Sequence, residues 1–279
     1  MPKTTSTIAF FTLEQVIALV KTHYGLTVTA RPLAGEVDFN FYLQTPAGEE
    51  YTLKISRPGE TRTTLEFQVA ILDHLNQQPL PWPVPQLIPS LSGEHLLEVT
   101  TEEGNAHFVR LQSWVSGRLL DDINPRSPEL LHQWGAACGH LNRALSDFDH
   151  PEAHRFYKWD PSQTLFSRQH LSLFATPAQQ EIASYFWDRF EKIIQPQLAS
   201  LRTTVNYNDA HELNLLVNDE GESPAICGVI DFGDALHTHL VNELAIACAY
   251  GVMGLPDPLT AACQLTQSFH QLQPLTEAE

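Results

Sequence analysis

Three polar residues in the second half of the chain have the types and spacing that phosphoryl transfer requires. Asp209 is followed five residues later by Asn214, and Asp231 opens an Asp-Phe-Gly sequence. Apolar runs at 215–217 and 226–230 flank a polar connection, which predicts a β-hairpin between these residues. Such a hairpin would bring them together. One Asp could orient a hydroxyl nucleophile, and Asn and a second Asp could hold Mg²⁺ on a nucleotide.

The net charge of the chain indicates which classes of molecule it could bind. The 279 residues carry a formal net charge of −17 and no Lys/Arg cluster, which argues against nucleic acid. An amine-bearing substrate suits this charge better, although acidity is also a general means of keeping a protein soluble. The four cysteines are widely spread without a Cys-x-x-Cys pair, which predicts free thiols. The sequence has no signal pattern and no apolar run of membrane length, so we expect a cytoplasmic protein with no membrane partner.

Hydrophobic periodicity divides the chain into two parts. The first begins with a helix capped by Thr12 and continues with strands, one further helix and a proline-rich crossing. We expect strands at 28–33, 39–44, 51–55, 96–100 and 107–115, the first three as an antiparallel meander, and a helix at 63–75. Beyond Gly117 the pattern becomes helical, and we expect helices at 127–145, 177–201 and 241–253. The prediction is an α+β fold, with a β-rich lobe at 1–115 and a mainly helical lobe at 116–279.

The two motif segments resemble a known family. Residues 207–214 read Tyr-Asn-Asp followed by Asn, and residues 230–234 read Ile-Asp-Phe-Gly-Asp. They are similar to the aminoglycoside phosphotransferase and choline kinase-like family, whose loop reads His-Gly-Asp-x-x-x-x-Asn. Together with residues 35–41, they look most like the hydroxylysine kinase-like branch, which includes domains fused to class-III aminotransferases. The resemblance covers nearly the whole chain and implies a protein-kinase-like two-lobed fold, with ATP or GTP as co-substrate and Mg²⁺ as cofactor.

Two residues of the loop depart from the family pattern. Tyr207 stands where the family usually has a histidine that braces the loop. Asn208 replaces the commoner glycine, a change that the backbone tolerates because asparagine readily adopts positive φ. Asp209 is the predicted catalytic residue, and Asn214 and Asp231 are the predicted metal ligands. Asn214 is also assigned to the nucleotide site.

The first lobe should supply the rest of the nucleotide site. Lys54 lies on the third predicted strand, where a kinase places the lysine that binds the α- and β-phosphates, although an outward-facing strand lysine would look the same. Its carboxylate partner on the following helix is expected to be Glu66, and an alternative register would place Gln68 there, which could hydrogen-bond without supplying charge.

The resemblance also places the turn at Gly35 over the phosphates. The segment 112–115, with Gln112 and Trp114, is expected where the lobes join, with its backbone at the purine edge. Trp114 could equally be a core residue.

The acceptor pocket is less clearly marked. Trp159 and Asp160 resemble a Trp-Asp element of the family near the acceptor, but Asp160 before Pro161 is equally suited to capping a helix. Asp234 is a second candidate for the acceptor site, and acidic residues there would suit an amine-bearing alcohol.

Histidines at 211, 237 and 239 suggest a zinc site as a competing reading. No His lies four residues after His211, so the His-Glu-x-x-His motif fails, and we favour the kinase.

The predicted reaction is transfer of a γ-phosphoryl group from ATP or GTP to a hydroxyl of an amine-bearing metabolite, either a hydroxylated amino acid or an amino alcohol. The alternatives are an aminoglycoside-modifying phosphotransferase and a catalytically weak pseudokinase domain of a larger fusion protein. The sequence stops near Thr276, a predicted helix start, which led us to expect a lobe truncated at its C-terminus.

Overall fold

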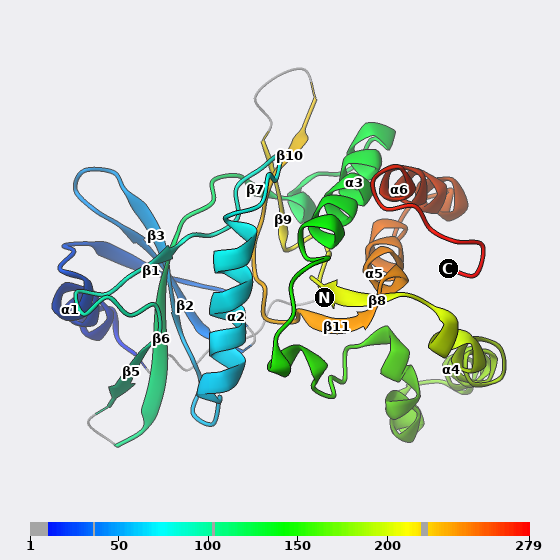
Figure 1. The fold of residues 1–279 in the computed structure, drawn as a ribbon, viewed down its shortest axis with the longest axis horizontal. Helices are drawn as coiled ribbons and strands as arrows, with labels where there is room; N and C mark the ends of the chain where they lie inside the picture. Colours follow the sequence, from blue (N-terminus) through cyan, green and yellow to red (C-terminus); the bar gives the residue numbers. More distant parts are fainter. Residues whose placement is uncertain (1–10, 36, 102–103, 219–222) are drawn as a thin grey trace. The chain divides into compact units, whose positions relative to one another are not determined.

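The computed structural model describes residues 11–35, 37–101, 104–218 and 223–279. Residue 36 of the predicted turn at Gly35 and residues 219–222 of the predicted hairpin connection lie outside these ranges. The chain forms two compact units (Figure 1). One comprises the described residues up to Asp73 together with Pro85–Val115, and the other comprises His74–Val84 together with Ser116–Glu279.

The first unit is built on an antiparallel sheet. Its strand order is β1-β2-β3-β6-β4, and β5 also pairs with β6. The predicted meander of the first three strands is confirmed. The strands are β1 (Thr29–Leu33), β2 (Phe39–Gln44), β3 (Glu50–Ile55), β4 (Leu87–Ile88), β5 (Leu97–Thr100) and β6 (Ala106–Ser113).

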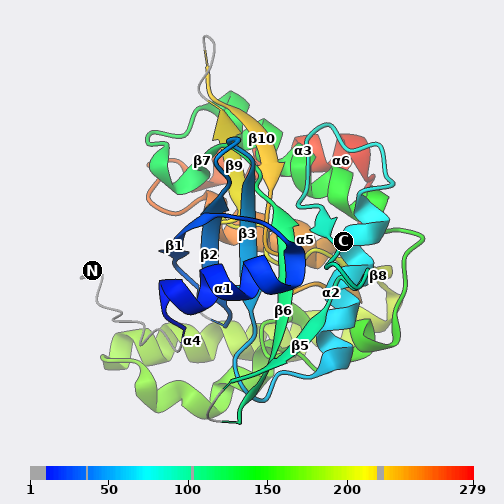
Figure 2. The same ribbon diagram turned by 90° about the vertical axis from the view of Figure 1, so that its left-hand side faces the viewer.

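Two helices accompany this sheet. The predicted capping box of Thr12 and Gln15 starts α1 (Leu13–Tyr24), which runs across the strands (Figure 2). Its buried face packs on alternate apolar residues of β2, β3 and β6 and forms the core of the unit. Helix α2 (Arg62–Leu75) contacts β6 from the opposite face, where Gln68 bonds to Arg110.

The second unit is mainly helical, as predicted. Its helices are α3 (Pro128–Ala144), α4 (Pro177–Arg189), α5 (Val241–Gly251) and α6 (Pro258–Leu272). Helices α3 and α6 approach so closely at Gly135 that only glycine fits there. A Cβ built on Gly135 would lie only 2.0 Å from the carbonyl oxygen of Leu265. The predicted helix at 177–201 instead changes at Phe190 into a π-turn and then a 3₁₀ segment, η5 (Gln195–Ser200), which contains Pro196. Proline lacks an N–H and cannot continue the α-helical hydrogen bonds.

Helix α6 and the 3₁₀ segments η2 (Pro151–His154) and η3 (Pro161–Leu173) were not predicted. In the part of the chain that the structure describes, no helix combines the length and the apolar character needed to cross a membrane.

Two small antiparallel sheets carry the predicted motifs. The predicted hairpin is confirmed as β9 (Leu215–Asn218) and β10 (Ala225–Val229), with β7 (Arg118–Leu119) beside β9. The other sheet pairs β8 (Thr203–Asn206) with β11 (Leu236–His239), which the sequence did not predict. Strand β8 therefore ends directly before the segment 207–214, and β10 ends at Val229, two residues before Asp231.

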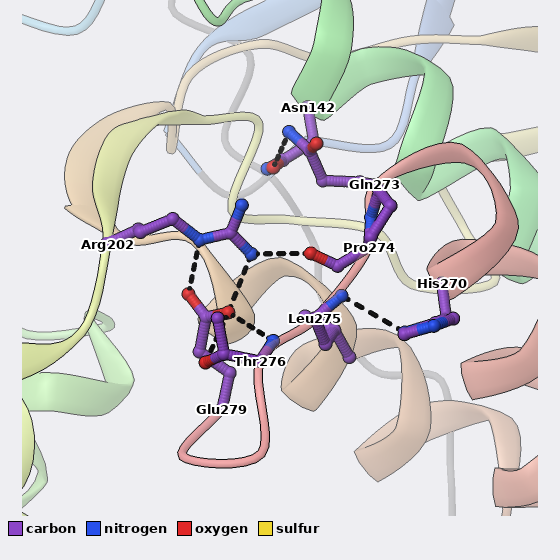
Figure 3. Close-up of polar contacts among 8 residues, drawn as sticks. All are labelled: Asn142, Arg202, His270, Gln273, Pro274, Leu275, Thr276 and Glu279. Atoms are coloured by element: carbon purple, nitrogen blue, oxygen red, sulfur yellow. Dashed lines mark hydrogen bonds and ion pairs between the residues drawn. The ribbon is translucent and has the colours of Figure 1, made fainter.

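Polar contacts fasten the last described residues to this sheet region. Figure 3 shows Arg202, which precedes β8, donating hydrogen bonds to the carboxylate of Glu279 and to the carbonyl of Pro274. Gln273 bonds to Asn142 of α3, and Asn142 in turn donates to the buried Asn206 at the end of β8. The start of the motif loop is therefore anchored to helices that lie on both sides of it in the sequence.

Candidate active site

The loop between β8 and β9 brings the predicted catalytic pair together. The side-chain amide of Asn214 donates to Oδ2 of Asp209 over 2.6 Å and to the carbonyl of Asp209 over 3.2 Å. Asn214 is buried, whereas the side chain of Asp209 keeps 25% of its surface exposed. The Asp209 carboxylate is thus fixed by the buried side-chain amide of Asn214, while its exposed part is accessible to a ligand.

Asp231 is coupled to the same loop through its neighbour Ile230. The Ile230 amide donates to the carbonyl of Asn214 over 3.0 Å, and the hydroxyl of Tyr207 donates to the carbonyl of Ile230 over 2.6 Å. Tyr207 is fully buried, with its ring against Phe232. The tyrosine that departs from the family pattern therefore ties the loop to the Asp-Phe-Gly segment.

A buried carboxylate that sequence reasoning missed holds the loop from behind. Oε2 of Glu243 in α5 accepts a hydrogen bond from the backbone amide of Asn208 over 2.8 Å. Asn208 has φ of +65°, the left-handed conformation anticipated for this position. Burial raises the pKa of Glu243 to about 7, and the charge of Asp209 adds to the effect. The sequence signal that could have identified Glu243 is its position as an acidic residue within an otherwise apolar helical segment.

His211 lies beside the catalytic carboxylate. Its Nδ1 accepts a hydrogen bond from the Leu213 amide, and its Nε2 lies 3.4 Å from Oδ1 of Asp209 and 3.2 Å from Nδ2 of Asn214. Burial alone would lower the pKa of His211, but hydrogen bonding to Asp209 and the surrounding acidic charge raise it on balance.

The other two histidines of the zinc reading are used elsewhere. His239 bonds to Ser162, and His237 stacks on His154. Across the described residues, no three His, Cys, Asp or Glu side chains are grouped so that they could hold a metal ion.

Asp234 forms a second acidic group near the loop. The hydroxyl of Tyr157 donates to its Oδ1, and Arg155 donates to the carbonyl of the preceding Gly233. The pKa of Asp234 is raised to about 6, chiefly by burial. The hydrogen bond from Tyr157 and the charge of Arg155 lower this pKa, and the charges of Asp209 and Asp231 contribute to raising it. The carboxylate of Asp234 therefore interacts electrostatically with the predicted catalytic residue Asp209 and the predicted metal ligand Asp231.

Of the predicted acceptor residues Trp159 and Asp160, the aspartate has a structural role in capping a helix. Asp160 is buried and caps η3 by accepting from the Ser162 amide, and it also accepts from Thr238 and Asn242. Capping was the alternative left open for this residue. Trp159 has 63% of its surface exposed. The contact of either residue with an acceptor stays a prediction.

In the first unit, Lys54 is buried on β3, directly opposite Arg110 of β6. Glu66 is about half exposed and lies 3.6 Å from Arg62, whereas Gln68 accepts a hydrogen bond from Arg110. The two candidate partners of Lys54 thus differ. Gln68 points toward the face of the sheet that carries Lys54, and Glu66 pairs with a neighbour on its own helix.

The remaining predicted nucleotide residues lie at two ends of the same sheet. Gly35 is confined, because a Cβ there would lie 2.4 Å from Nδ2 of Asn40. Gln112 is buried within β6, and the backbone amide of Trp114 donates to the carbonyl of Glu50. The Trp114 ring meets Tyr42 edge-on. That amide is therefore already paired, and the roles of Gln112 and Trp114 at a purine stay predictions.

The donor set of the second unit fits a magnesium ion. Mg²⁺ prefers oxygen ligands and is usually held by one or two carboxylates together with substrate phosphates, so it does not need three acidic side chains. Asp231 is exposed, and its charge and that of Asp209 raise the pKa of Asp234. A divalent cation at Asp231 and Asn214 would offset this mutual repulsion.

The fold and the paired Asp-Asn and Asp-Phe-Gly segments define a protein-kinase-like phosphotransferase, which confirms the predicted fold class. The chain belongs to the phosphotransferase enzyme family, which it matches over residues 29–273. It is a kinase that uses an alcohol group as acceptor. Members of this family use a nucleotide co-substrate with a divalent metal.

Several curated relatives are named hydroxylysine kinase. The chain is 29% identical to the one from Danio rerio, covering 95% of this chain and 77% of the relative. It is 24% identical to the one from Mus musculus, and this match covers 96% of this chain and 77% of the relative. The resemblance to the hydroxylysine kinase-like branch is thereby confirmed.

Solved structures share the fold at low sequence identity. A microcompartment-associated aminopropanol kinase aligns with a TM-score of 0.76 at 16% identity, covering 95% of this chain and 82% of that one. An amicoumacin kinase in complex with AMP-PNP and Ca²⁺ aligns with a TM-score of 0.70 at 17% identity, covering 96% and 80%.

Proposed function

We propose that this kinase transfers the γ-phosphoryl group of ATP or GTP to the hydroxyl of an amine-bearing metabolite, a hydroxylated amino acid or an amino alcohol. The observation that carries the proposal is the contact between Asp209 and Asn214 in a loop that Tyr207 ties to the segment of Asp231. The relatives named hydroxylysine kinase support this acceptor class over an aminoglycoside.

In the proposed mechanism, the carboxylate of Asp209 accepts a hydrogen bond from the acceptor hydroxyl and takes its proton as the phosphoryl group is transferred. The oxygens of Asn214 and Asp231 would hold Mg²⁺, which when bound neutralises phosphate charge. Lys54 binds the nucleotide phosphates, in a nucleotide lobe at 1–115 that also includes Gly35, Gln112 and Trp114. The helical lobe at 116–279 carries out catalysis.

Asp234 is the residue we assign to the ammonium group of the acceptor. It is a carboxylate held in place by Tyr157, and it lies within electrostatic range of Asp209. An acceptor with its amine near its hydroxyl could therefore contact Asp209 and Asp234 together. Trp159 and Asp160 are assigned to the outer part of the same pocket.

The test measures nucleoside diphosphate release with Mg·ATP and Mg·GTP against 5-hydroxylysine, 1-amino-2-propanol and kanamycin, with lysine as the acceptor that lacks a hydroxyl. We expect turnover with the first two and none with lysine. Asp209→Asn should lower turnover by roughly 10²- to 10⁴-fold, the usual contribution of a general base, and leave nucleotide binding nearly intact.

Asp122→Asn is the matched control, because Asp122 is an exposed aspartate of the short 3₁₀ segment η1 (Leu120–Asp122). Full activity in the Asp209→Asn variant would contradict the assignment of the catalytic residue. Turnover with kanamycin alone would instead identify an aminoglycoside-modifying enzyme.

A further inference from the structure

A buried arginine connects three segments of the first unit. Arg110 on β6 is 1% exposed. Its Nη2 lies 2.6 Å from Oδ2 of Asp38, and its Nη1 donates to the side-chain oxygen of Gln68 in α2. The side chain of Asp38 is itself only 10% exposed. A buried charge of this kind is costly unless it is paired, so the arginine and the aspartate depend on each other.

The path of this ion pair crosses the strand that carries Lys54. The sheet order places β3 between β6 and β2, and Asp38 directly precedes β2. Neighbouring strands lie about 4.8 Å apart, so Arg110 must reach over β3 to meet Asp38. Lys54 is directly opposite Arg110, and Asn40 is directly opposite Lys54. Directly opposed residues project from the same face, so Lys54 shares this face with the pair.

The same ion pair fixes the turn that we assign to the nucleotide phosphates. The Asn40 side chain donates to the carbonyl of Ala34, and Gly35 packs so tightly that a Cβ would lie 2.7 Å from the carbonyl oxygen of Asp38. Asn40 therefore holds one end of this turn, and Asp38, through Arg110, holds the other.

We propose that Arg110 is a positioning residue of the nucleotide site. By pairing with Asp38, it keeps that carboxylate from competing with nucleotide phosphates for the ammonium group of Lys54. By binding Gln68, it fixes α2 on the same face of the sheet, while Glu66 pairs with Arg62. This inference rests on the proposed function, in which Lys54 binds the phosphates.

The experiment measures binding of Mg·AMP-PNP by titration calorimetry, together with KM for nucleotide and for acceptor. In Arg110→Met, the unpaired Asp38 would turn to Lys54. Loss of one charged hydrogen bond to phosphate should weaken nucleotide binding roughly ten- to a hundredfold, with KM for the acceptor unchanged. Adding Asp38→Asn to this variant removes the competing carboxylate and should restore the part of the binding that was lost to competition, although the contact between residues 38 and 110 stays broken. A residue that only supported the fold would not be rescued in this way.

Two further variants test whether any loss of nucleotide binding comes specifically from the Arg110–Asp38 pair. Asp38→Asn alone preserves size and a side-chain oxygen that can still accept from Arg110, so the contact at the turn is kept while the competing charge is removed. This variant should bind Mg·AMP-PNP about as tightly as the unmodified protein, and binding as weak as that of Arg110→Met would overturn the proposal. Arg57→Met is the matched control, because Arg57 is an exposed arginine of the same unit that lies over the ring of Phe39.

The results also separate this inference from the function on which it rests. Unchanged binding in Lys54→Met would refute the phosphate-binding role of Lys54, and with it the inference. Weakened binding in Lys54→Met but not in Arg110→Met would overturn the inference alone. Equal weakening in Arg110→Met and in the Asp38→Asn/Arg110→Met double variant would also overturn it.

Discussion

Replacing Glu243 with Gln tests how the catalytic loop is held from behind. The substitution keeps the size of the side chain and an oxygen that can accept from the Asn208 amide, but it removes the ability to ionise. Glu243 is fully buried in α5, and its Oε1 has no hydrogen-bond partner within the described residues. A negative charge there is stabilised mainly by the hydrogen bond from the backbone amide of Asn208, with a smaller contribution from the backbone of Tyr207.

The size of the effect follows from the pKa. Burial raises the pKa of Glu243 from its ordinary 4.5 to about 7. Because the pKa is higher in the folded state, the neutral carboxyl stabilises the fold fully below pH 4.5, and this stabilisation is lost as the pH rises through 7. The gap between 4.5 and about 7 corresponds to about 3 kcal/mol of unfolding free energy. Gln cannot ionise, so the variant avoids this loss.

Urea unfolding of both proteins without nucleotide, at intervals from about pH 4.5 to about pH 8, measures the difference directly. The stability of Glu243→Gln relative to the unmodified protein should rise across this range by up to about 3 kcal/mol. Any cost of the new amide N–H shifts the whole curve without changing its slope. Glu181→Gln, at an exposed position of α4, should show a flat difference. A flat difference for Glu243→Gln as well would show that Glu243 does not titrate in this range, which would refute the reasoning.

Three further outcomes follow from the second unit. Mg²⁺ with nucleotide should raise the midpoint of thermal unfolding, and Asp231→Asn should remove this metal-dependent part, which a titration with EDTA and then Mg²⁺ checks. Gly135→Ala should lower the unfolding free energy by about 1–3 kcal/mol, because the methyl group would meet the carbonyl of Leu265, and denaturant unfolding measures it. Tyr157→Phe removes a hydrogen bond that lowers the pKa of Asp234, so that pKa should rise, and the acidic limb of the pH–rate profile should move to higher pH.

Local patterns predicted the elements whose signals are contiguous in the sequence. The meander and the catalytic hairpin follow from apolar alternation and turn residues, and α1 follows from its capping box. Helix α6 was missed although Asp257 and Pro258 form a helix start and its buried positions Ala261, Leu265 and Phe269 recur at helical spacing. Its main partner is α3, more than a hundred residues earlier, so the need for a covering helix is visible only in three dimensions.

Buried charges were the least predictable part of the site for the same reason. Asp38 and Arg110 are 72 residues apart in the sequence, and the Asn208 amide and Glu243 are 35 residues apart. Each of these side chains looks like an ordinary surface charge until its partner is known. Sequence alone therefore indicated which residues could do chemistry, but it did not indicate which residues hold them in position.

Tyr207 shows why a departure from a family motif has to be judged by contacts. Asn208 and Asp231 both have left-handed backbone conformations, with φ of +65° and +60°. Each such non-glycine residue costs on the order of 1–3 kcal/mol and persists only where the surroundings enforce it. Tyr207 immediately precedes the first, and its hydroxyl binds the carbonyl of Ile230, which immediately precedes the second. One buried side chain thus connects the two strained positions, which is the bracing role that the family pattern assigns to histidine.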